Sequence, residues 1–586
     1  MNVIKRNGVE VQFDPEKIQR AIAGVNNDLP EDKKMSPPAI ALIANSVVAT
    51  CCTFKRALGV EEIQDIVEKA LAEHGLYQAS KEYILYRYKR AQIRQQKTLT
   101  EKLTASNVQN QNANVDEASF GGRLGEAASF VTKQYALDHL MSKMAVRNHN
   151  NNEIYTHDLD HYALGDHNCL SIPFDKLLAE GFNTRQTDVR PAGSLNTAFQ
   201  LVAVIFQLQS LQQFGGVSAT HLDWTMVPYF RMSFWKHYWD GVHYIHGKSI
   251  EEVAMDKEGA YMHAKGLTIR DISIEDEKAY DKDSKAYKYA MEKTLKELDQ
   301  AVEGMLHNLN TLQSRSGCQL PFTSINYGTC TSTEGRMVIK ALIEGTMKGV
   351  GKFHKTSIFP CGIFQCMKGV NRKPGDPNYD LFRLALKCTA QRIYPNYVNV
   401  DWSGNAGYDL ENPCTYMSTM GCRTANGWDI NCEDPKLGQL KDGRGNICPC
   451  SLILPELAMQ AKTPEAFMEL LDKKIHEAKD QLIERFNWIC SQPAAAAKFM
   501  YENGTMYGYK PEEGIRSALK HGTLAMGQLG LAECLQILIG CDHTDPKGMD
   551  LAKQIEGLFK KRCAEFKQEY KLNFGVYYTP KYCWAA

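Results

Sequence analysis

The pattern of apolar and polar positions divides the chain into a short N-terminal part and a long second part. Residues 3–6 and 9–11 are expected to form two strands joined by a turn at Asn7 and Gly8. Asp14 and Pro15 suit the N-cap and the first position of a helix. Apolar residues at helical spacing predict further helices over residues 39–52, 60–73 and 83–95. We therefore expect a small, mostly helical domain over residues 1–97, followed by a polar linker over residues 98–118.

The second part, residues 119–580, alternates helical and strand-like patterns without a comparable break. The helical patterns cover residues 126–147, 195–213, 285–311 and 464–491. The strand-like segments include residues 168–172, 319–326 and 447–454. This alternation is typical of an α/β domain with a mostly parallel sheet, and a barrel is compatible with its length.

The charge balance of the chain excludes some classes of partner. Lysine and arginine together number 68, as do aspartate and glutamate, so the formal net charge is zero. Because there is no basic surplus, the sequence does not indicate a nucleic-acid partner. Apolar runs such as Leu201–Phe206 are too short to span a bilayer, and the N-terminus lacks the apolar core of a signal peptide. We expect a cytoplasmic protein that binds neither membranes nor nucleic acid.

The chain contains 18 cysteines, but none of them are spaced as a Cys-x-x-Cys pair. In a reducing compartment these residues should be free thiols and not a disulfide framework. Most are expected to be small buried hydrophobic residues. A metal site built from this chain alone is not expected.

A group of residues near the N-terminus suggests nucleotide binding. Val3, Lys5 and Arg6 on the first predicted strand, with Lys17 on the next helix, could converge on a triphosphate. The alternative is that these cations are simply solvated. The order of these residues, with Gly8, Phe13, Asp14 and Ile18, resembles the ATP-cone, a regulatory nucleotide-binding domain. The resemblance implies that ATP and dATP bind at Val3, Lys5, Arg6 and Lys17 as allosteric effectors.

Five stretches of the long domain resemble the anaerobic (class III) ribonucleoside-triphosphate reductases. They are residues 119–123, 155–158 leading into 167–169, 418–423, 443–446 and 574–580. Each stretch alone is weak evidence for this family, but the occurrence of all five in this order behind an ATP-cone is specific for it. The resemblance implies a ten-stranded α/β barrel of the glycyl-radical enzyme and ribonucleotide reductase type. It also implies reduction of ribonucleoside triphosphates to 2′-deoxyribonucleoside triphosphates for DNA precursor synthesis.

This chemistry needs a cysteine that can carry a radical. The 2′-hydroxyl of a ribose is replaced by hydrogen only after the 3′ carbon has become a radical, and a thiyl radical on an apolar, water-free loop can take that 3′ hydrogen. The resemblance implies that Cys422 is this cysteine, with Met420 as its apolar neighbour; a buried inert thiol is the alternative. Cys169 would be the second active-site cysteine, acting on the other side of the ribose. Asn446 would bond the ribose hydroxyls, because an amide both donates and accepts.

The sequence gives weaker indications of the reductant and of the residues that bind the substrate phosphates. The pairing of Met420 with Asn446 is similar to the formate-using branch, in which formate reduces the substrate radical and leaves as carbon dioxide. A thiol protein as reductant is the alternative. Asn168 and Ser194 are candidate substrate-binding residues. Ser194 lies at the start of a predicted helix, and a helix N-terminus attracts anions such as the substrate phosphates. Ser194 could equally be only an N-cap.

The resemblance ends at Pro580, which leaves residues 581–586 as a tail unlike the family. The family continues with a last strand, a four-cysteine zinc site and a loop whose glycine carries a radical installed by a radical-S-adenosylmethionine activating enzyme. We expect the glycyl radical and zinc on a missing segment, such as a separate C-terminal glycyl-radical polypeptide, and we expect a homodimer. The alternatives are an inactive truncated chain, a regulatory nucleotide-binding fragment and a pyruvate formate-lyase-like enzyme.

Overall fold

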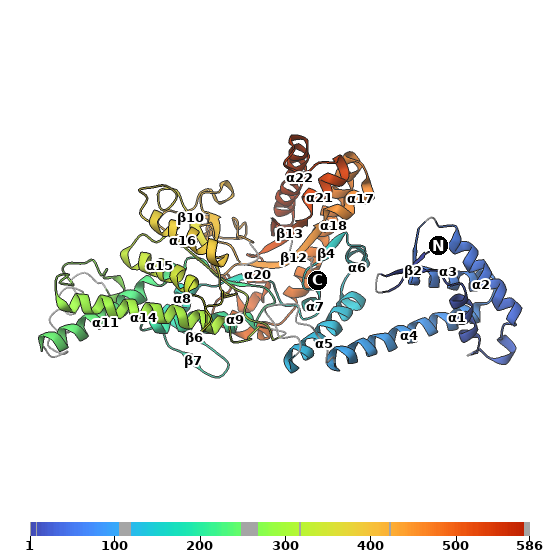
Figure 1. The fold of residues 1–586 in the computed structure, drawn as a ribbon, viewed down its shortest axis with the longest axis horizontal. Helices are drawn as coiled ribbons and strands as arrows, with labels where there is room; N and C mark the ends of the chain where they lie inside the picture. Colours follow the sequence, from blue (N-terminus) through green and yellow to red (C-terminus); the bar gives the residue numbers. More distant parts are fainter. Residues whose placement is uncertain are drawn as a thin grey trace. The chain divides into compact units, whose positions relative to one another are not determined.

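The computed structural model describes residues 2–6, 9–27, 29–54, 56–104, 119–247, 268–315, 318–420 and 424–578. The chain forms two compact units, Met1–Ala105 and Ser106–Ala586 (Figure 1). Within the described residues, no helix combines the length and the apolar character that crossing a membrane requires.

The first unit is a small sheet packed against four helices. Strand β1 (Asn2–Ile4) pairs antiparallel with β2 (Glu10–Gln12) and parallel with β3 (Leu58–Gly59). The helices are α1 (Glu16–Asn27), α2 (Pro37–Cys52), α3 (Val60–Glu73) and α4 (Tyr77–Thr104). The predicted hairpin and helices are confirmed, although the turn at residues 7 and 8 lies outside the described residues. The Asp14 carboxylate accepts the Glu16 N–H at 3.1 Å, as expected of a helix cap.

Helix α4 is longer than the sequence pattern predicts. It runs to Thr104, so residues 98–104 are helical although they were expected to begin the linker. Glu101, Lys102 and Leu103 favour helix, which explains how a polar segment without apolar periodicity continues the helix. The rest of the predicted linker, residues 105–118, lies outside the described residues.

The second unit is built on two sheets. The first consists of five parallel strands in the order β11-β10-β9-β8-β5, and the second has the order β14-β13-β12-β4 with only β4 antiparallel. The strands of the first sheet are β5 (Leu170–Ser171), β8 (Val217–Ala219), β9 (Thr323–Tyr327), β10 (Cys361–Cys366) and β11 (Asn396–Asn399). Those of the second are β4 (Ile154–Thr156), β12 (Asn446–Ile453), β13 (Thr523–Leu529) and β14 (Asn573–Tyr578).

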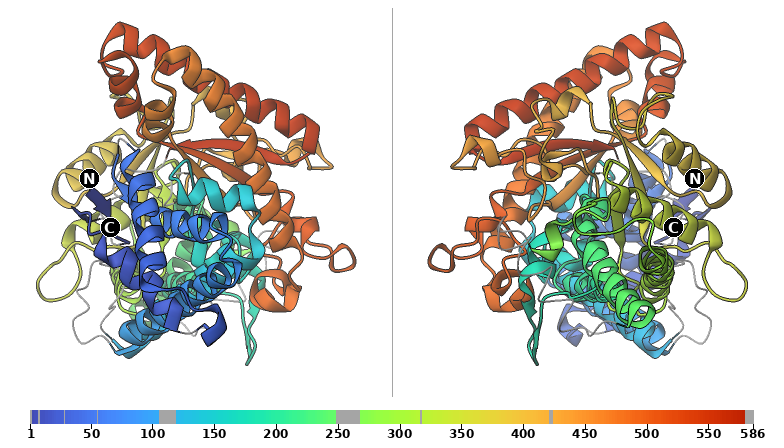
Figure 2. Two further views of the ribbon diagram at one scale, coloured as in Figure 1. Left: turned by 90° about the vertical axis from the view of Figure 1, so that its right-hand side faces the viewer. Right: turned by 90° about the vertical axis from the view of Figure 1, so that its left-hand side faces the viewer.

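Long helices cover each sheet and form a separate apolar core with it. The core of the first sheet includes side chains from α9 (Leu195–Ser210), α11 (Val227–His246), α14 (Lys285–Leu309), α15 (Thr333–Lys348) and α16 (Tyr379–Arg392). The core of the second includes α17 (Leu454–Ala461), α18 (Pro464–Cys490), α21 (Leu531–Ile539) and α22 (Pro546–Tyr570). Helices α11 and α14 lie side by side (Figures 1 and 2).

Shorter elements connect these layers. They include α5 (Phe120–Tyr135), α6 (Lys143–Asn150), α7 (Leu159–Tyr162), α8 (Phe174–Glu180), α10 (Leu222–Thr225), α19 (Lys498–Glu502), α20 (Arg516–Leu519) and the hairpin of β6 (Phe182–Asn183) and β7 (Asp188–Val189). The single helix predicted over residues 126–147 is therefore wrong. A break before Ser142 separates α5 from α6, and Ser142 caps the second helix by accepting the Ala145 N–H at 3.3 Å.

The two sheets are joined where β5 meets the beginning of β12. The Cys169 N–H donates to Asn446 O at 2.8 Å, and the Ser171 N–H donates to Arg444 O at 2.9 Å, in an antiparallel arrangement. A Cβ atom on Gly445 would lie 1.7 Å from Cys169 O, so only glycine permits this approach. The two sheets are therefore continuous through this joint, and the predicted α/β barrel-type fold is confirmed.

Candidate active site

The chain segments on either side of residues 421–423 pair with each other and are here called the incoming and outgoing stems of the loop. Thr419 and Ala425 form an antiparallel bridge, and the Met420 N–H donates to Thr424 O at 3.0 Å. Cys422, the predicted radical cysteine, lies outside the described residues. The described stems nevertheless fix where the chain enters and leaves the loop.

Polar side chains from the first sheet hold the incoming stem. Asn326 on β9 accepts the Thr419 N–H at 3.1 Å and donates to Thr419 O at 2.9 Å. Ser218 on β8 also donates to Thr419 O, at 3.3 Å, and Gln365 on β10 donates to Met417 O at 3.0 Å. All three side chains are buried. The sequence analysis missed them, although a polar residue within an apolar strand was a signal that could have found them.

Buried cations hold the outgoing stem. The Lys441 ammonium donates to Asn426 O at 2.8 Å, and the Arg444 guanidinium donates to Gly427 O at 3.0 Å. Asn426 in turn donates to Arg444 O at 3.0 Å. Burial, reinforced by the nearby Arg444, lowers the pKa of Lys441 to about 7. The outgoing stem is therefore anchored by the segment that leads into β12 of the second sheet.

The structure brings three of the predicted catalytic residues to the base of this loop. Cys169 and Asn446 are adjacent across the joint between the sheets, and Met420 is linked to them through Thr424, whose hydroxyl accepts from the Asn446 amide at 3.5 Å. Cys169, Met420 and Asn446 are each about 1% exposed. The Asn446 Oδ1 atom accepts no hydrogen bond from the described residues. A buried amide oxygen of this kind can accept from a ligand hydroxyl.

Asn168 contacts the side chain of Cys169. Its Oδ1 atom accepts from the Cys169 thiol at 3.2 Å, and its carbonyl accepts from the Gln213 amide at 2.8 Å. A Cβ atom on Gly215 would lie 1.9 Å from Asn168 Oδ1, so the side chain is tightly enclosed. These contacts orient Cys169, whereas a direct role of Asn168 in substrate binding stays a prediction.

Ser194 is the N-cap of helix α9. Its hydroxyl accepts the Thr197 N–H at 3.2 Å and caps α9. The neighbouring Asn196 N–H donates to the Glu297 carboxylate at 3.0 Å, and the Leu195 N–H donates to the Ser233 hydroxyl. Since a carboxylate already occupies this helix N-terminus, an anionic phosphate is disfavoured there. The geometry accounts for Ser194 as a helix cap, and a role in binding the substrate phosphates stays a prediction.

A cavity lies in the N-terminal unit and has a volume of about 170 Å³. Val3, Lys5 and Lys17 line it, together with apolar side chains that include Ile18 and Val67. Arg6 is not among its lining residues. Its guanidinium donates to the Glu61 carboxylate at 2.6 Å, a contact that the sequence pattern does not reveal. Three of the four predicted effector residues thus converge, and the fourth is held by an acidic partner.

Comparisons with known proteins cover nearly the whole chain. A family described as "Anaerobic ribonucleoside-triphosphate reductase" matches residues 111–581, and "ATP cone domain" matches residues 1–92. The anaerobic ribonucleoside-triphosphate reductase of Escherichia coli is 29% identical over 99% of this chain and 76% of its own length. That of phage T4 is 26% identical over 81% of this chain and 71% of its own. The anaerobic ribonucleotide reductase of Thermotoga maritima, solved with dATP and CTP, has a similar fold, with a TM-score of 0.52, 15% identity, and coverage of 78% of this chain and 69% of that one.

Proposed function

Because the chain belongs to the anaerobic ribonucleoside-triphosphate reductase family, we propose that it reduces ribonucleoside triphosphates to 2′-deoxyribonucleoside triphosphates in the absence of oxygen. With formate as reductant, one ribonucleoside triphosphate, one formate and one proton give one deoxyribonucleoside triphosphate, carbon dioxide and water. The pyruvate formate-lyase alternative is set aside, because the family match covers residues 111–581 and an ATP-cone match precedes it.

The observation that carries this proposal is the loop anchored from both sheets. Asn326 holds the incoming stem at Thr419 and Arg444 holds the outgoing stem at Gly427, so the chain is fixed on both sides of the segment that contains Cys422. A radical cysteine needs such restriction, since hydrogen abstraction requires the reacting atoms to be in near contact. In this account Cys422 takes the 3′ hydrogen of the ribose. A glycyl radical, installed by a radical-S-adenosylmethionine activating enzyme, supplies the unpaired electron.

Cys169 and Asn446 take the remaining roles at the ribose. The Cys169 thiol donates a hydrogen bond to Asn168, so it retains the proton that protonation of the leaving 2′-oxygen would use. The Asn446 Oδ1 atom is buried and has no partner among the described residues, and a ribose hydroxyl would satisfy it. The pairing of Asn446 with Met420 is the reason for preferring formate over a thiol protein.

The N-terminal cavity is the proposed effector site. Its apolar walls suit a nucleotide base, and Lys5 and Lys17, both exposed side chains, suit the triphosphate. ATP is proposed to favour activity and dATP to oppose it, because each would stabilise a different state of a homodimeric assembly.

An anaerobic turnover assay tests the proposal. The protein is incubated with an activating enzyme, S-adenosylmethionine, an electron donor, a source of the glycyl radical, one ribonucleoside triphosphate and labelled formate. Formation of deoxynucleotide and labelled carbon dioxide in equal amounts supports the proposal. Turnover that proceeds without formate but requires a reduced thiol protein would support the family function and reject formate as reductant.

A further inference from the structure

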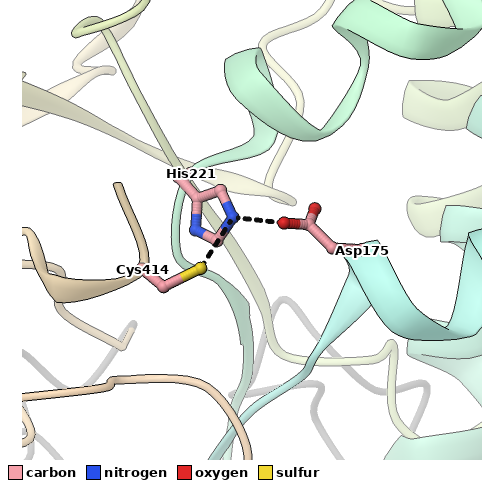
Figure 3. A group of neighbouring side chains, drawn as sticks. All are labelled: Asp175, His221 and Cys414. Atoms are coloured by element: carbon pink, nitrogen blue, oxygen red, sulfur yellow. Dashed lines mark hydrogen bonds and ion pairs between the residues drawn. The ribbon is translucent and has the colours of Figure 1, made fainter. Parts of the chain in front are cut away.

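Three side chains outside the proposed ribose site converge on one point (Figure 3). Asp175 lies on α8, His221 directly precedes α10, and Cys414 lies in the short 3₁₀ turn Pro413–Thr415. The His221 Nε2 atom lies 2.9 Å from Asp175 Oδ2 and 3.7 Å from Cys414 Sγ. The three atoms all lie within 4.8 Å of one another.

The hydrogen bonding of His221 shows which ring nitrogen faces the other two residues. The Thr220 hydroxyl donates to Asp442 Oδ1 at 2.6 Å, so its oxygen is left to accept from His221 Nδ1, also at 2.6 Å. With the proton on Nδ1, the lone pair of a neutral imidazole is on Nε2 and points toward the Asp175 carboxylate and the Cys414 sulfur. Three electron-rich atoms facing one another repel unless a proton or a metal cation lies among them.

This arrangement differs from that of a catalytic triad. In a Cys-His-Asp relay the thiol and the carboxylate contact opposite ring nitrogens. Here both approach Nε2, whereas Nδ1 is held by Thr220. Convergence on one nitrogen is the arrangement of ligands around a common centre.

The outer contacts also resemble those of a metal site. Metal-binding histidines commonly donate their second ring N–H to an oxygen that fixes the ring, and coordinating carboxylates accept further hydrogen bonds. Thr220 supplies the first of these contacts, and Thr225 donates to Asp175 Oδ1 at 2.6 Å. His221 is 2% exposed, whereas the Asp175 side chain is 51% exposed, which leaves a route for an ion to enter.

We propose that Asp175, His221 and Cys414 bind one first-row divalent transition metal of the zinc type. A thiolate, an imidazole and a carboxylate suit zinc, cobalt or iron, whereas magnesium and calcium prefer oxygen ligands alone. In a tetrahedral zinc site the nitrogen would lie about 3.6 Å from sulfur and about 3.3 Å from oxygen. The observed 3.7 Å and 2.9 Å are near these separations, so the exposed carboxylate has to withdraw only slightly.

The position of the site indicates what the metal does. Cys414 precedes Met420 by six residues, in the segment that enters the anchored loop. Its carbonyl accepts the Lys441 N–H at 3.0 Å, so the same turn also contacts the residue that holds the outgoing stem. A metal at this point would fasten the entry to the loop to α8 and to the end of β8. Its role is therefore structural, since it lies outside the proposed ribose contacts.

Titration of the metal-depleted full chain with Co²⁺ under anoxia tests this proposal. The expected result is one equivalent bound, with a cobalt–thiolate charge-transfer band in the near ultraviolet and tetrahedral bands in the visible. Cys414→Ser should abolish the charge-transfer band. Asp175→Asn, a change at a half-exposed side chain that keeps the Thr225 contact possible, should weaken binding by at least about tenfold. Circular dichroism establishes that each variant is folded.

Cys541→Ser is the matched control, because Cys541 is a partly buried cysteine in the segment between α21 and α22, remote in sequence from the site. It should leave both the stoichiometry and the spectrum unchanged. Bound Zn²⁺ should also protect Cys414, but not Cys541, from alkylation measured by mass spectrometry. If Cys414→Ser and Asp175→Asn bind Co²⁺ as the parent protein does, or if no thiolate band develops, the cluster is a protonated histidine ion pair and the proposal is wrong. These readouts do not depend on nucleotide reduction.

Discussion

The carboxamide of Asn326 binds both backbone polar groups of Thr419, accepting its N–H at 3.1 Å and donating to its carbonyl at 2.9 Å. Asn326 is fully buried on β9, whereas Thr419 lies in the stem that leads to Cys422. A rigid strand thus fixes the backbone of the loop directly. A side-chain amide can satisfy both groups at once, because it has an acceptor oxygen and a donor nitrogen.

Asn326→Ala should impair catalysis more than it impairs stability. The change removes the side-chain acceptor of the Thr419 N–H and leaves the Thr419 carbonyl with only the 3.3 Å contact from Ser218 among the described residues, at a cost of about 1–3 kcal/mol of unfolding free energy. Because the loop loses its anchor, anaerobic turnover should fall by at least about 100-fold.

The matched control for this prediction is Asn371→Ala. Asn371 is equally buried and also holds backbone groups, donating to Gly328 O and Gln365 O, but it does not contact the loop. It should lose comparable stability in urea unfolding and keep most of its turnover. Equal losses of turnover in the two variants would show that the Asn326 contact has no special role.

Cys422→Ser and Cys169→Ser should each abolish nucleotide reduction while leaving nucleotide binding intact. Oxygen holds its hydrogen too strongly for a serine to replace the thiyl cysteine, and a hydroxyl is a poorer acid than a thiol at the ribose. Cys448→Ser is the control, because its thiol is buried on the same strand as Asn446 but donates to Leu482 O in the helix-packed core. Measurable reduction by Cys422→Ser, from product analysis by chromatography, would remove Cys422 from its proposed role.

Lys17→Ala and Lys5→Ala should weaken dATP binding and raise the dATP concentration needed for inhibition. Both side chains line the N-terminal cavity and are exposed enough to reach a triphosphate. Arg6→Ala should have a smaller effect, because its guanidinium is paired with Glu61. Lys69→Ala, at an exposed residue of α3 that pairs with Glu73, is the control in a calorimetric titration. If all four variants respond to dATP alike, the effector binds elsewhere.

The buried Lys441 should make stability depend on pH. Its pKa is lowered to about 7 in the folded protein, mainly by burial, and lies near 10.4 in the unfolded chain. Between these values the unfolded state binds more protons, so the unfolding free energy contributed by this group rises from pH 7 toward pH 10.

Comparison of the parent protein with Lys441→Met isolates this contribution. The difference between their unfolding free energies, from urea titrations at pH 6.5 and pH 9, should shift in favour of the parent protein at the higher pH. Other titrating groups cancel in the comparison. A difference that does not change with pH would mean that Lys441 titrates near its ordinary value.

The sequence predicted local elements better than contacts between distant segments. The N-terminal hairpin and the α/β alternation follow from local periodicity, and the motif around Cys422 was recognisable as a stretch of sequence. The hydrogen bonds between Asn326 and Thr419 could not be predicted from the sequence, since they depend on which strands are neighbours in the sheet. Similarly, the pairing of Arg6 with Glu61 and of Asn196 with Glu297 each joins residues far apart in the chain. Such pairs could not be foreseen from local sequence, although they bear on the surroundings of Arg6 and Ser194.

The proposed formate-dependent reduction is tested most directly by measuring the products of ribonucleoside triphosphate and labelled formate in one anaerobic reaction. With an activating enzyme and a source of the glycyl radical, the protein should form deoxynucleotide and labelled carbon dioxide in a one-to-one ratio. Asn326→Ala should slow both products equally, and Cys422→Ser should form neither. Deoxynucleotide production that persists in Cys422→Ser would contradict the account, because the anchored loop would then not carry the reacting cysteine.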